Sequence, residues 1–224
     1  MRNSTRAGFD RDLQALQDDL LMMGSMVQKA IFKALDGLKN RDLSISRQVI
    51  AEDDLIDRKR FMIEDRCIDL IATQQPLAKD LRAIITVLHI SVELERMGDY
   101  AEGLAKISLR MGEQPPLKPL IDIPRMAEKA TEMLRRALDS LVRQDVALAR
   151  DVCASDDEVD ELYTQVYHEL LLYMAQDPKT IERATFLLWA AHDIERIADR
   201  ATNVAERVIY LVTGKLSELN AGRY

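Results

Sequence analysis

One five-residue string that occurs twice limits what this chain can fold into more than any other feature. It reads ERMGD at residues 95–99 and recurs 100 residues further on as ERIAD at residues 195–199. Acids four residues apart lie on one face of an α-helix, a turn apart. Each copy therefore presents two carboxylates side by side: Glu95 with Asp99, and Glu195 with Asp199. Because like charges at this spacing weaken an isolated helix by roughly 0.2–0.5 kcal/mol, each pair needs a neutralising partner.

The apolar residues before and around the first string follow helical spacing. Between residues 12 and 38 they recur in alternating steps of three and four, which is typical of a bundle helix, although Gly24 and Gly37 interrupt the pattern. A second segment begins at Leu43 and ends by Pro76, because proline lacks the N–H group that a helix interior needs. A third segment, about 77–111, contains the string. The second segment has a seam of apolar residues every seventh position: Val49, Ile56, Ile63 and Leu70.

A proline-rich stretch divides the chain, and the pattern then repeats. Residues 112–124 contain four of the six prolines, which indicates a stiff linker with Pro124 near the start of the next helix and Asp122 as its cap. Helices are predicted at about 124–142 and 179–212, and the latter contains the second string. The segment between them again has a seam at sevens: Val152, Val159, Val166 and Tyr173.

These patterns predict an all-α protein made of two tandem three-helix bundles related by internal duplication. The first bundle is expected at residues 8–111, the linker at 112–124 and the second bundle at 125–213. Gly214 is expected to stop the last helix, and residues 214–224 to form a tail. Only 8 glycines among 224 residues fit a chain that is helical throughout.

A second repeated motif places acids on the middle helix of each half. The sequence AEDDLID at residues 51–57 aligns with ASDDEVD at residues 154–160. Each copy contains acids four apart, Asp53 with Asp57 and Asp156 with Asp160. Both pairs lie on or beside the apolar seam, where an unpaired charge is costly.

If the second and third helices of each half pack antiparallel, two acid pairs face each other. Four carboxylates form an oxygen-rich site of the kind that hard metal cations prefer. The alternative is that the acids stay solvated or form ion pairs with nearby arginines, namely Arg58, Arg60, Arg96, Arg196 and Arg200. The predicted metal ligands are Asp53, Asp57, Glu95, Asp99, Asp156, Asp160, Glu195 and Asp199.

Other classes of function find little support in the sequence. The net charge of −7 argues against nucleic acid as the main partner. No apolar run approaches the ~18–20 residues needed to span a bilayer, and the charged residues 1–12 are not followed by the apolar core of a signal peptide. Two cysteines without a C-x-x-C motif fit a reducing compartment, so we expect a cytoplasmic protein. No residue set suggests a catalytic nucleophile or phosphate loop, and none of the three histidines follows a glutamate by three positions, as di-iron bundles require. We expect His89 to pack in the core.

The two repeated motifs, together with QPLAKDLR at residues 75–82, resemble the PhoU family, regulators of bacterial high-affinity phosphate uptake. The resemblance covers about residues 8–213. It implies a pair of three-helix bundles, a frequent dimer, and metal ions of uncertain identity (iron, manganese, magnesium, calcium or zinc) on the eight acids named above. Two departures are Gly103, where the second copy has Asn203, and the additional acid Glu102.

The resemblance also implies a function. A PhoU-like protein restrains the phosphate-starvation response by linking the sensor histidine kinase to the ATPase of the phosphate ABC transporter, at the cytoplasmic face of the membrane, and it is not an enzyme. The residues alone leave two alternatives open. One is a metal-dependent bundle enzyme, a phosphohydrolase or a di-metal oxidase, and the other is an all-α interaction scaffold whose acids only form ion pairs.

Overall fold

The computed structural model describes residues 2–215, and their side chains from residue 7 onward. Within this range the chain forms six α-helices, one short 3₁₀ helix and no strand, which confirms the predicted all-α fold. The helices are α1 (Arg2–Asn40), α2 (Leu43–Gln74), α3 (Lys79–Met111), α4 (Asp122–Arg143), α5 (Val146–Gln176) and α6 (Ile181–Thr213), with the 3₁₀ turn η1 (Pro178–Thr180) before α6.

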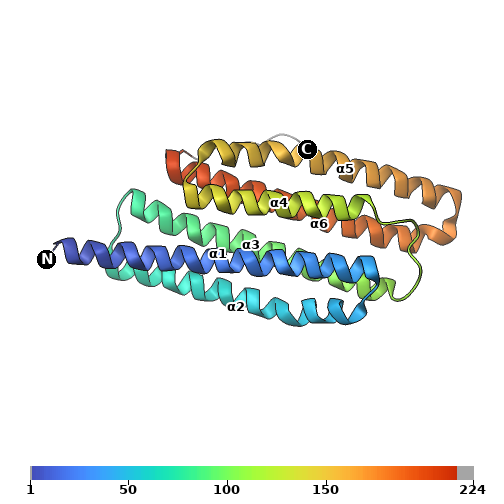
Figure 1. Cartoon of the computed structure of the whole chain (residues 1–224), viewed down its shortest axis with the longest axis horizontal. Helices are drawn as coiled ribbons and strands as arrows, with labels where there is room; N and C mark the ends of the chain where they lie inside the picture. Colours follow the sequence, from blue (N-terminus) through green and yellow to red (C-terminus); the bar gives the residue numbers. More distant parts are fainter. Residues whose placement is uncertain (1, 216–224) are drawn as a thin grey trace.

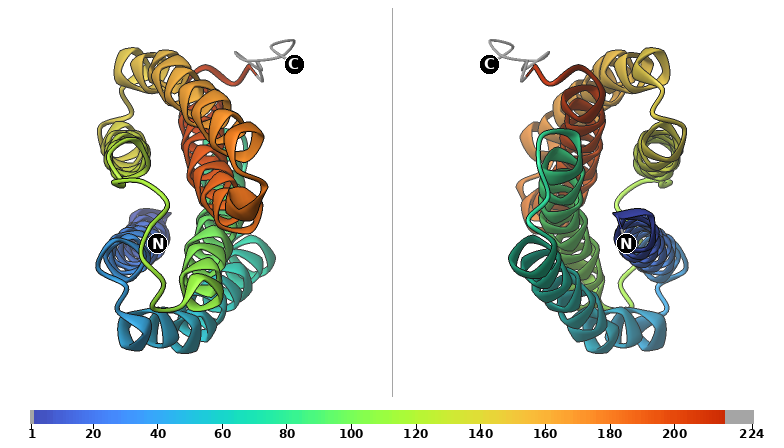
Figure 2. Two further views of the ribbon diagram at one scale, coloured as in Figure 1. Left: turned by 90° about the vertical axis from the view of Figure 1, so that its right-hand side faces the viewer. Right: turned by 90° about the vertical axis from the view of Figure 1, so that its left-hand side faces the viewer.

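Two three-helix bundles, α1–α3 and α4–α6, lie side by side (Figure 1). The end-on views show α3 beside α6 on one side of the molecule, and α1 beside α4 on the other (Figure 2). α3 packs against both other helices of its bundle and against α6, and α6 does the same in the second bundle. The two helices that contain the repeated string therefore form the centre of the molecule.

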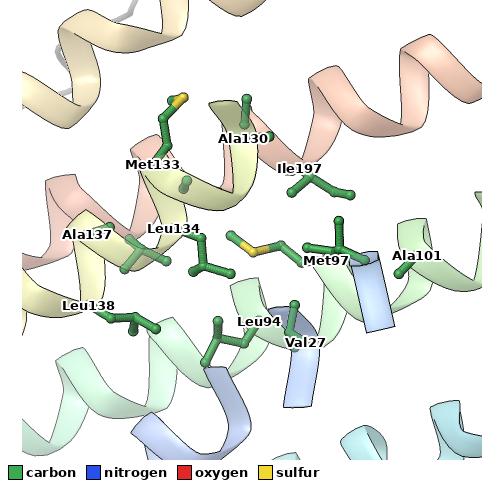
Figure 3. Close-up of a cluster of buried hydrophobic side chains, with 14 of the residues drawn as sticks. Val27, Leu94, Met97, Ala101, Ala130, Met133, Leu134, Ala137, Leu138 and Ile197 are labelled. Atoms are coloured by element: carbon green, nitrogen blue, oxygen red, sulfur yellow. The ribbon is translucent and has the colours of Figure 1, made fainter. Parts of the chain in front are cut away.

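The predicted seams lie in the core. Val49, Ile56, Ile63 and Leu70 are buried on α2, as are Val152, Val159 and Val166 on α5, whereas Tyr173 is half-buried. One continuous apolar cluster joins the two bundles. Figure 3 shows part of it, where Val27, Leu94 and Met97 of the first bundle lie with Leu134, Leu138 and Ile197 of the second.

Several predicted helix ends need correction. α1 begins at Arg2 rather than near residue 12 and continues through Gly24 and Gly37. α4 begins at Asp122, with Ile121 in the cap position and no side-chain cap hydrogen bond. Asp122 is the first residue of α4 rather than its cap, and its carboxylate lies 3.6 Å from Nζ of Lys118, in the linker.

Other ends follow the local chemistry of the sequence. The Asp42 carboxylate accepts hydrogen bonds from the N–H groups of Ser44 and Ile45 at the start of α2, and Asp145 accepts one from Leu148 at the start of α5. Gly214 ends α6 with φ = 71°, a left-handed conformation that glycine adopts without strain. Most of the predicted tail, residues 216–224, lies outside the described range.

None of the helices within residues 2–215 has the length and apolar character that crossing a membrane requires.

Candidate functional site

The predicted ligands of the first bundle lie at the contact between α2 and α3. Asp53, Asp57 and Glu95 are half-buried, and Asp99 is exposed. Burial raises the pKa of Asp53 to about 6, and the charges of Glu102, Asp57 and Asp99 raise it further. The packing therefore brings these carboxylates close enough to repel one another, as the prediction of facing acid pairs requires.

Gly98, inside the string, lets α2 approach. A Cβ atom at this position would lie 3.1 Å from Ile56 Cδ1 and 3.4 Å from Asp53 Oδ1. The second string has Ala198 at this position, so the two sites are not identical in shape.

Glu95 has a cationic neighbour from the other helix. Arg60 Nε on α2 lies 3.4 Å from Glu95 Oε1, and the same guanidinium lies 2.9 Å from Glu64 Oε2. Burial and the Asp99 charge raise the pKa of Glu95, and Arg60 partly opposes this rise. The Arg60 guanidinium therefore contacts both Glu95 and Glu64, so only part of its charge offsets the carboxylates of the site.

The second site, between α5 and α6, is more deeply buried. Asp156 and Glu195 are 5% and 7% exposed, Asp199 is half-buried, and Asp160 is exposed. Burial raises the pKa of Asp156 to about 7 and that of Asp160 to about 6, with further increases from the neighbouring carboxylates. Burial also raises the pKa of Asp199, and Glu195 adds to that shift.

Arginine neutralises the second string directly. Arg196 donates to both oxygens of Glu195, at 2.6 and 2.5 Å, and its third nitrogen lies 2.9 Å from Asp199 Oδ2. His192 lies one turn away, with Nδ1 3.8 Å from Glu195 Oε2. Two of the arginines named as alternative partners, Arg60 and Arg196, thus pair with string acids.

For two of the other three arginines, the ion-pair partner lies outside the set of eight acids. Arg96 and Arg200 both approach Glu93, at 3.9 and 3.3 Å, and Arg58 is exposed.

The donor atoms are of the right type for a hard cation, but they are not assembled around one point. All eight are carboxylates, the ligands that Mg²⁺, Ca²⁺, Mn²⁺ and iron accept. Among the described residues, no group of three or more His, Cys, Asp or Glu side chains is arranged to hold a metal ion. Metal binding by these residues therefore stays a prediction.

A third acid position in each repeat was missed by sequence reasoning. Glu93 Oε2 on α3 accepts hydrogen bonds from Arg200 Nη1 at 3.3 Å and Asn203 Nδ2 at 3.1 Å, both on α6. This contact ties the two bundles together. Its equivalent, Asp193, also stands two residues before its string, and that shared position was the available signal.

Asp193, the equivalent of Glu93 in the second repeat, has different surroundings. Asp193 faces Gly103, where a Cβ atom would lie only 2.7 Å from Asp193 Oδ2, and burial raises its pKa to about 7. The departure at Gly103 noted in the sequence thus makes room for Asp193.

The expectation that His89 packs in the core was wrong, because His89 is exposed beside α6, where burial and the Arg207 charge lower its pKa.

Known proteins are similar in sequence to this chain over nearly its whole length. A family profile described as the PhoU domain matches residues 20–108 and again 123–208. The phosphate-specific transport system accessory protein PhoU homolog of Clostridium acetobutylicum is 40% identical over 217 residues, which cover 96% of this chain and 99% of that protein. The Aquifex aeolicus protein of the same name is 43% identical over 206 residues, covering 92% and 93% of the two chains.

Solved structures agree with the sequence relatives. The crystal structure of PhoU from Pseudomonas aeruginosa matches with a TM-score of 0.89 at 35% identity, over 92% of this chain and all of that one. The phosphate transport system regulatory protein PhoU from Streptococcus pneumoniae matches with a TM-score of 0.88 at 29% identity, over 94% of this chain and all of that one. With both repeats matched, and with relatives that are 40% and 43% identical over nearly their whole length, this chain belongs to the PhoU family.

Proposed function

We propose that this chain is a regulator of phosphate uptake that binds metal ions and acts through protein contacts rather than catalysis. The observation that carries the proposal is its similarity, over nearly its full length, to proteins named as an accessory or regulatory protein of phosphate transport. Its role is to restrain uptake and the phosphate-starvation response by linking the phosphate ABC transporter ATPase to the sensor histidine kinase. It acts in the cytoplasm, as a homodimer, at the inner face of the membrane.

The metal part of the proposal rests on the two carboxylate sets. Asp53, Asp57, Glu95 and Asp99 would hold cations in the first bundle; Asp156, Asp160, Glu195 and Asp199 would do so in the second. The raised pKa values of Asp53 and Asp156 support this assignment, because burial and the neighbouring carboxylates both disfavour the charged form, and a bound cation would favour it. The cation would supply charge neutralisation and join neighbouring helices.

The partner part is supported by an apolar groove in the first bundle. A groove of about 260 Å³ lies between α1 and α2, with Met26, Leu55 and Ile56 in its lining and Lys29 and Lys33 among its charged residues. Leu55 is 49% exposed. Larger contiguous apolar patches mark protein-contact sites, and the proposal takes this groove to be part of one.

The corresponding groove of the second bundle differs in chemistry. It lies between α4 and α5 and its lining is mostly charged, with Lys129 and Glu158 forming an ion pair across it. Glu158 is the aligned equivalent of Leu55. The proposal therefore assigns partner contact to the groove of the first bundle.

Metal content tests the first part. The paired variants Asp53→Asn with Glu95→Gln, and Asp156→Asn with Glu195→Gln, are compared by elemental analysis with Asp54→Asn, whose side chain is exposed beside Asp53. Each pair is expected to lose the metal of its own bundle, and Asp54→Asn to keep the wild-type content. Unchanged metal in both pairs would contradict the assignment.

Binding to purified kinase and transporter ATPase tests the second part. Leu55→Glu introduces the residue that the second bundle has at this position, and it is expected to weaken binding by tenfold or more, at a cost of roughly 1.4 kcal/mol. Leu172→Glu on α5, where Leu172 is 62% exposed, serves as the control. Equal binding by both variants would remove the groove from the proposal, and turnover of a phosphate ester by the metal-loaded protein would favour an enzyme instead.

A further inference from the structure

The arginine in the middle of the second string lies where a cation is needed. Arg196 contacts Glu195 through Nε and Nη2, at 2.6 and 2.5 Å, and Asp199 through Nη1, at 2.9 Å. The three side chains are 22%, 10% and 17% exposed, so the contacts are largely shielded from water. Neighbouring residues on a helix diverge in direction, which means that Arg196 bends back to reach Glu195.

The first string contains the same arginine but uses it differently. Arg96 is 51% exposed and its ion-pair partner is Glu93, at 3.9 Å, not the acids of its own string. The counter-charge there is Arg60 of α2, which reaches Glu95 with a single nitrogen at 3.4 Å. The residue aligned with Arg60 in the second bundle is Tyr163, so α5 supplies no such cation.

A bidentate guanidinium and a metal ion compete for the same atoms. Arg196 contacts both oxygens of Glu195 and one oxygen of Asp199, and its positive charge would repel a cation coordinated by the same atoms. Charge-assisted bonds of this kind are stronger in a shielded site than at a surface. A cation coordinated by Glu195 and Asp199 would therefore have to displace the guanidinium.

We propose that Arg196 is the built-in counter-cation of the second site, and that metal binds there only when its guanidinium swings out to the surface. The inference rests on the proposed metal function. It has two consequences: Arg196 sets the metal affinity of the second bundle, and metal binding places a new positive charge on the exposed side of α6.

The affinity test isolates the second site. In protein that already carries Asp53→Asn and Glu95→Gln, we would titrate metal-stripped samples with Mn²⁺ by calorimetry. Arg196→Gln is expected to tighten binding by roughly ten- to hundredfold, since the metal no longer has to break charge-assisted hydrogen bonds. Arg196→Lys keeps the charge but loses the planar guanidinium, and its Mn²⁺ affinity is expected to lie between those of the parent and Arg196→Gln. Arg96→Gln is the matched control and should bind as the parent does.

Chemical labelling gives a readout that does not depend on affinity. Phenylglyoxal modification of Arg196, measured by peptide mass spectrometry in the wild-type chain, is expected to increase several-fold when Mn²⁺ is added, whereas modification of Arg96 stays constant. A ligand that merely covered Arg196 would reduce its labelling.

The outcomes separate this inference from the metal function. Mn²⁺ binding with equal affinity in Arg196→Gln and Arg96→Gln, or labelling of Arg196 that does not rise, overturns the inference and leaves the metal site standing. No Mn²⁺ binding in the wild type or in any variant overturns both. Binding that occurs only once Arg196 is replaced would show that the guanidinium blocks the site without moving out of it, which overturns the proposed displacement of Arg196.

Discussion

At the scale of single residues, the repeated strings combine burial with charge, and each half neutralises that charge in its own way. Arg60 forms an ion pair with Glu95 from the neighbouring helix, and Arg196 forms one with Glu195 from the adjacent position in the same helix. The sequence predicted which acids share a helix face, because that follows from helical spacing alone. It could not predict which arginine contacts the acids, since a long side chain has many possible rotamers and the packed neighbours determine which one is adopted.

Asp193 is the residue whose titration should be simplest to follow, because burial alone raises its pKa from 3.8 to about 7. Between these values the folded state holds a proton that the unfolded state has lost. The contribution of Asp193 to the free energy of unfolding is therefore highest below about pH 4, and it falls as the pH rises to about 7.

The variant Asp193→Asn removes this dependence. We expect it to be more stable than the wild type by about 1–2 kcal/mol near pH 8, a value reduced from the full effect of the shift because the side chain is partly exposed, and to show no advantage near pH 4. Urea unfolding at both pH values measures the difference. A variant that is no more stable than wild type at the higher pH would contradict the burial of this carboxylate.

At the scale of helices, most helix boundaries could be predicted from the sequence. Asp42, Asp145 and Gly214 act as the caps and stop that their residue types favour. The start of α1 was placed too late because residues 2–11 have almost no apolar periodicity. Phe9 is the exception, and it is only 6% exposed. Because extending an existing helix is easier than starting one, this single buried side chain accounts for the start of α1 at Arg2.

Two glycines of α1 provide a matched test of how that helix packs. A Cβ atom at Gly24 would lie 2.4 Å from Leu138 Cδ1 on α4, whereas one at Gly8 would meet no atom within 4 Å. Gly24→Ala is expected to destabilise the protein by about 1–3 kcal/mol, because the clash outweighs the gain in helix propensity. Gly8→Ala should stabilise it by up to about 1 kcal/mol.

Thermal unfolding of the two glycine variants measures both effects. The expected result is opposite shifts in Tm. A Gly24→Ala protein as stable as Gly8→Ala would contradict tight packing of α1 on α4 at this point, because Leu138 would then move aside at little cost.

At the scale of the whole molecule, the duplication predicted two bundles but not how they meet. Their contact depends on α3 against α6 and on the close approach at Gly24 and Gly103, which sequence periodicity cannot show because it describes only one helix at a time. The polar part of the contact is also asymmetric. Glu93 bonds to Arg200 and Asn203, whereas its equivalent Asp193 faces Gly103.

The Glu93 contact should couple the stabilities of the two bundles. Glu93→Gln is expected to lower the free energy of unfolding by about 1–3 kcal/mol, since Arg200 would lose a charged partner. A double-mutant cycle with Asn203→Ala should give a non-zero coupling energy, and Asp54→Asn serves as an exposed control. Additive effects of Glu93→Gln and Asn203→Ala would contradict a direct bond between α3 and α6.

The central claim is that carboxylates from adjacent helices of each bundle bind a cation. Anomalous diffraction from crystals of the Mn²⁺-loaded protein tests it most directly. The account predicts peaks between α2 and α3, at Asp53 and Glu95, and between α5 and α6, at Asp156 and Glu195, with Arg196 turned away from the second peak. An absence of peaks at both positions, with manganese found elsewhere or nowhere, would contradict it.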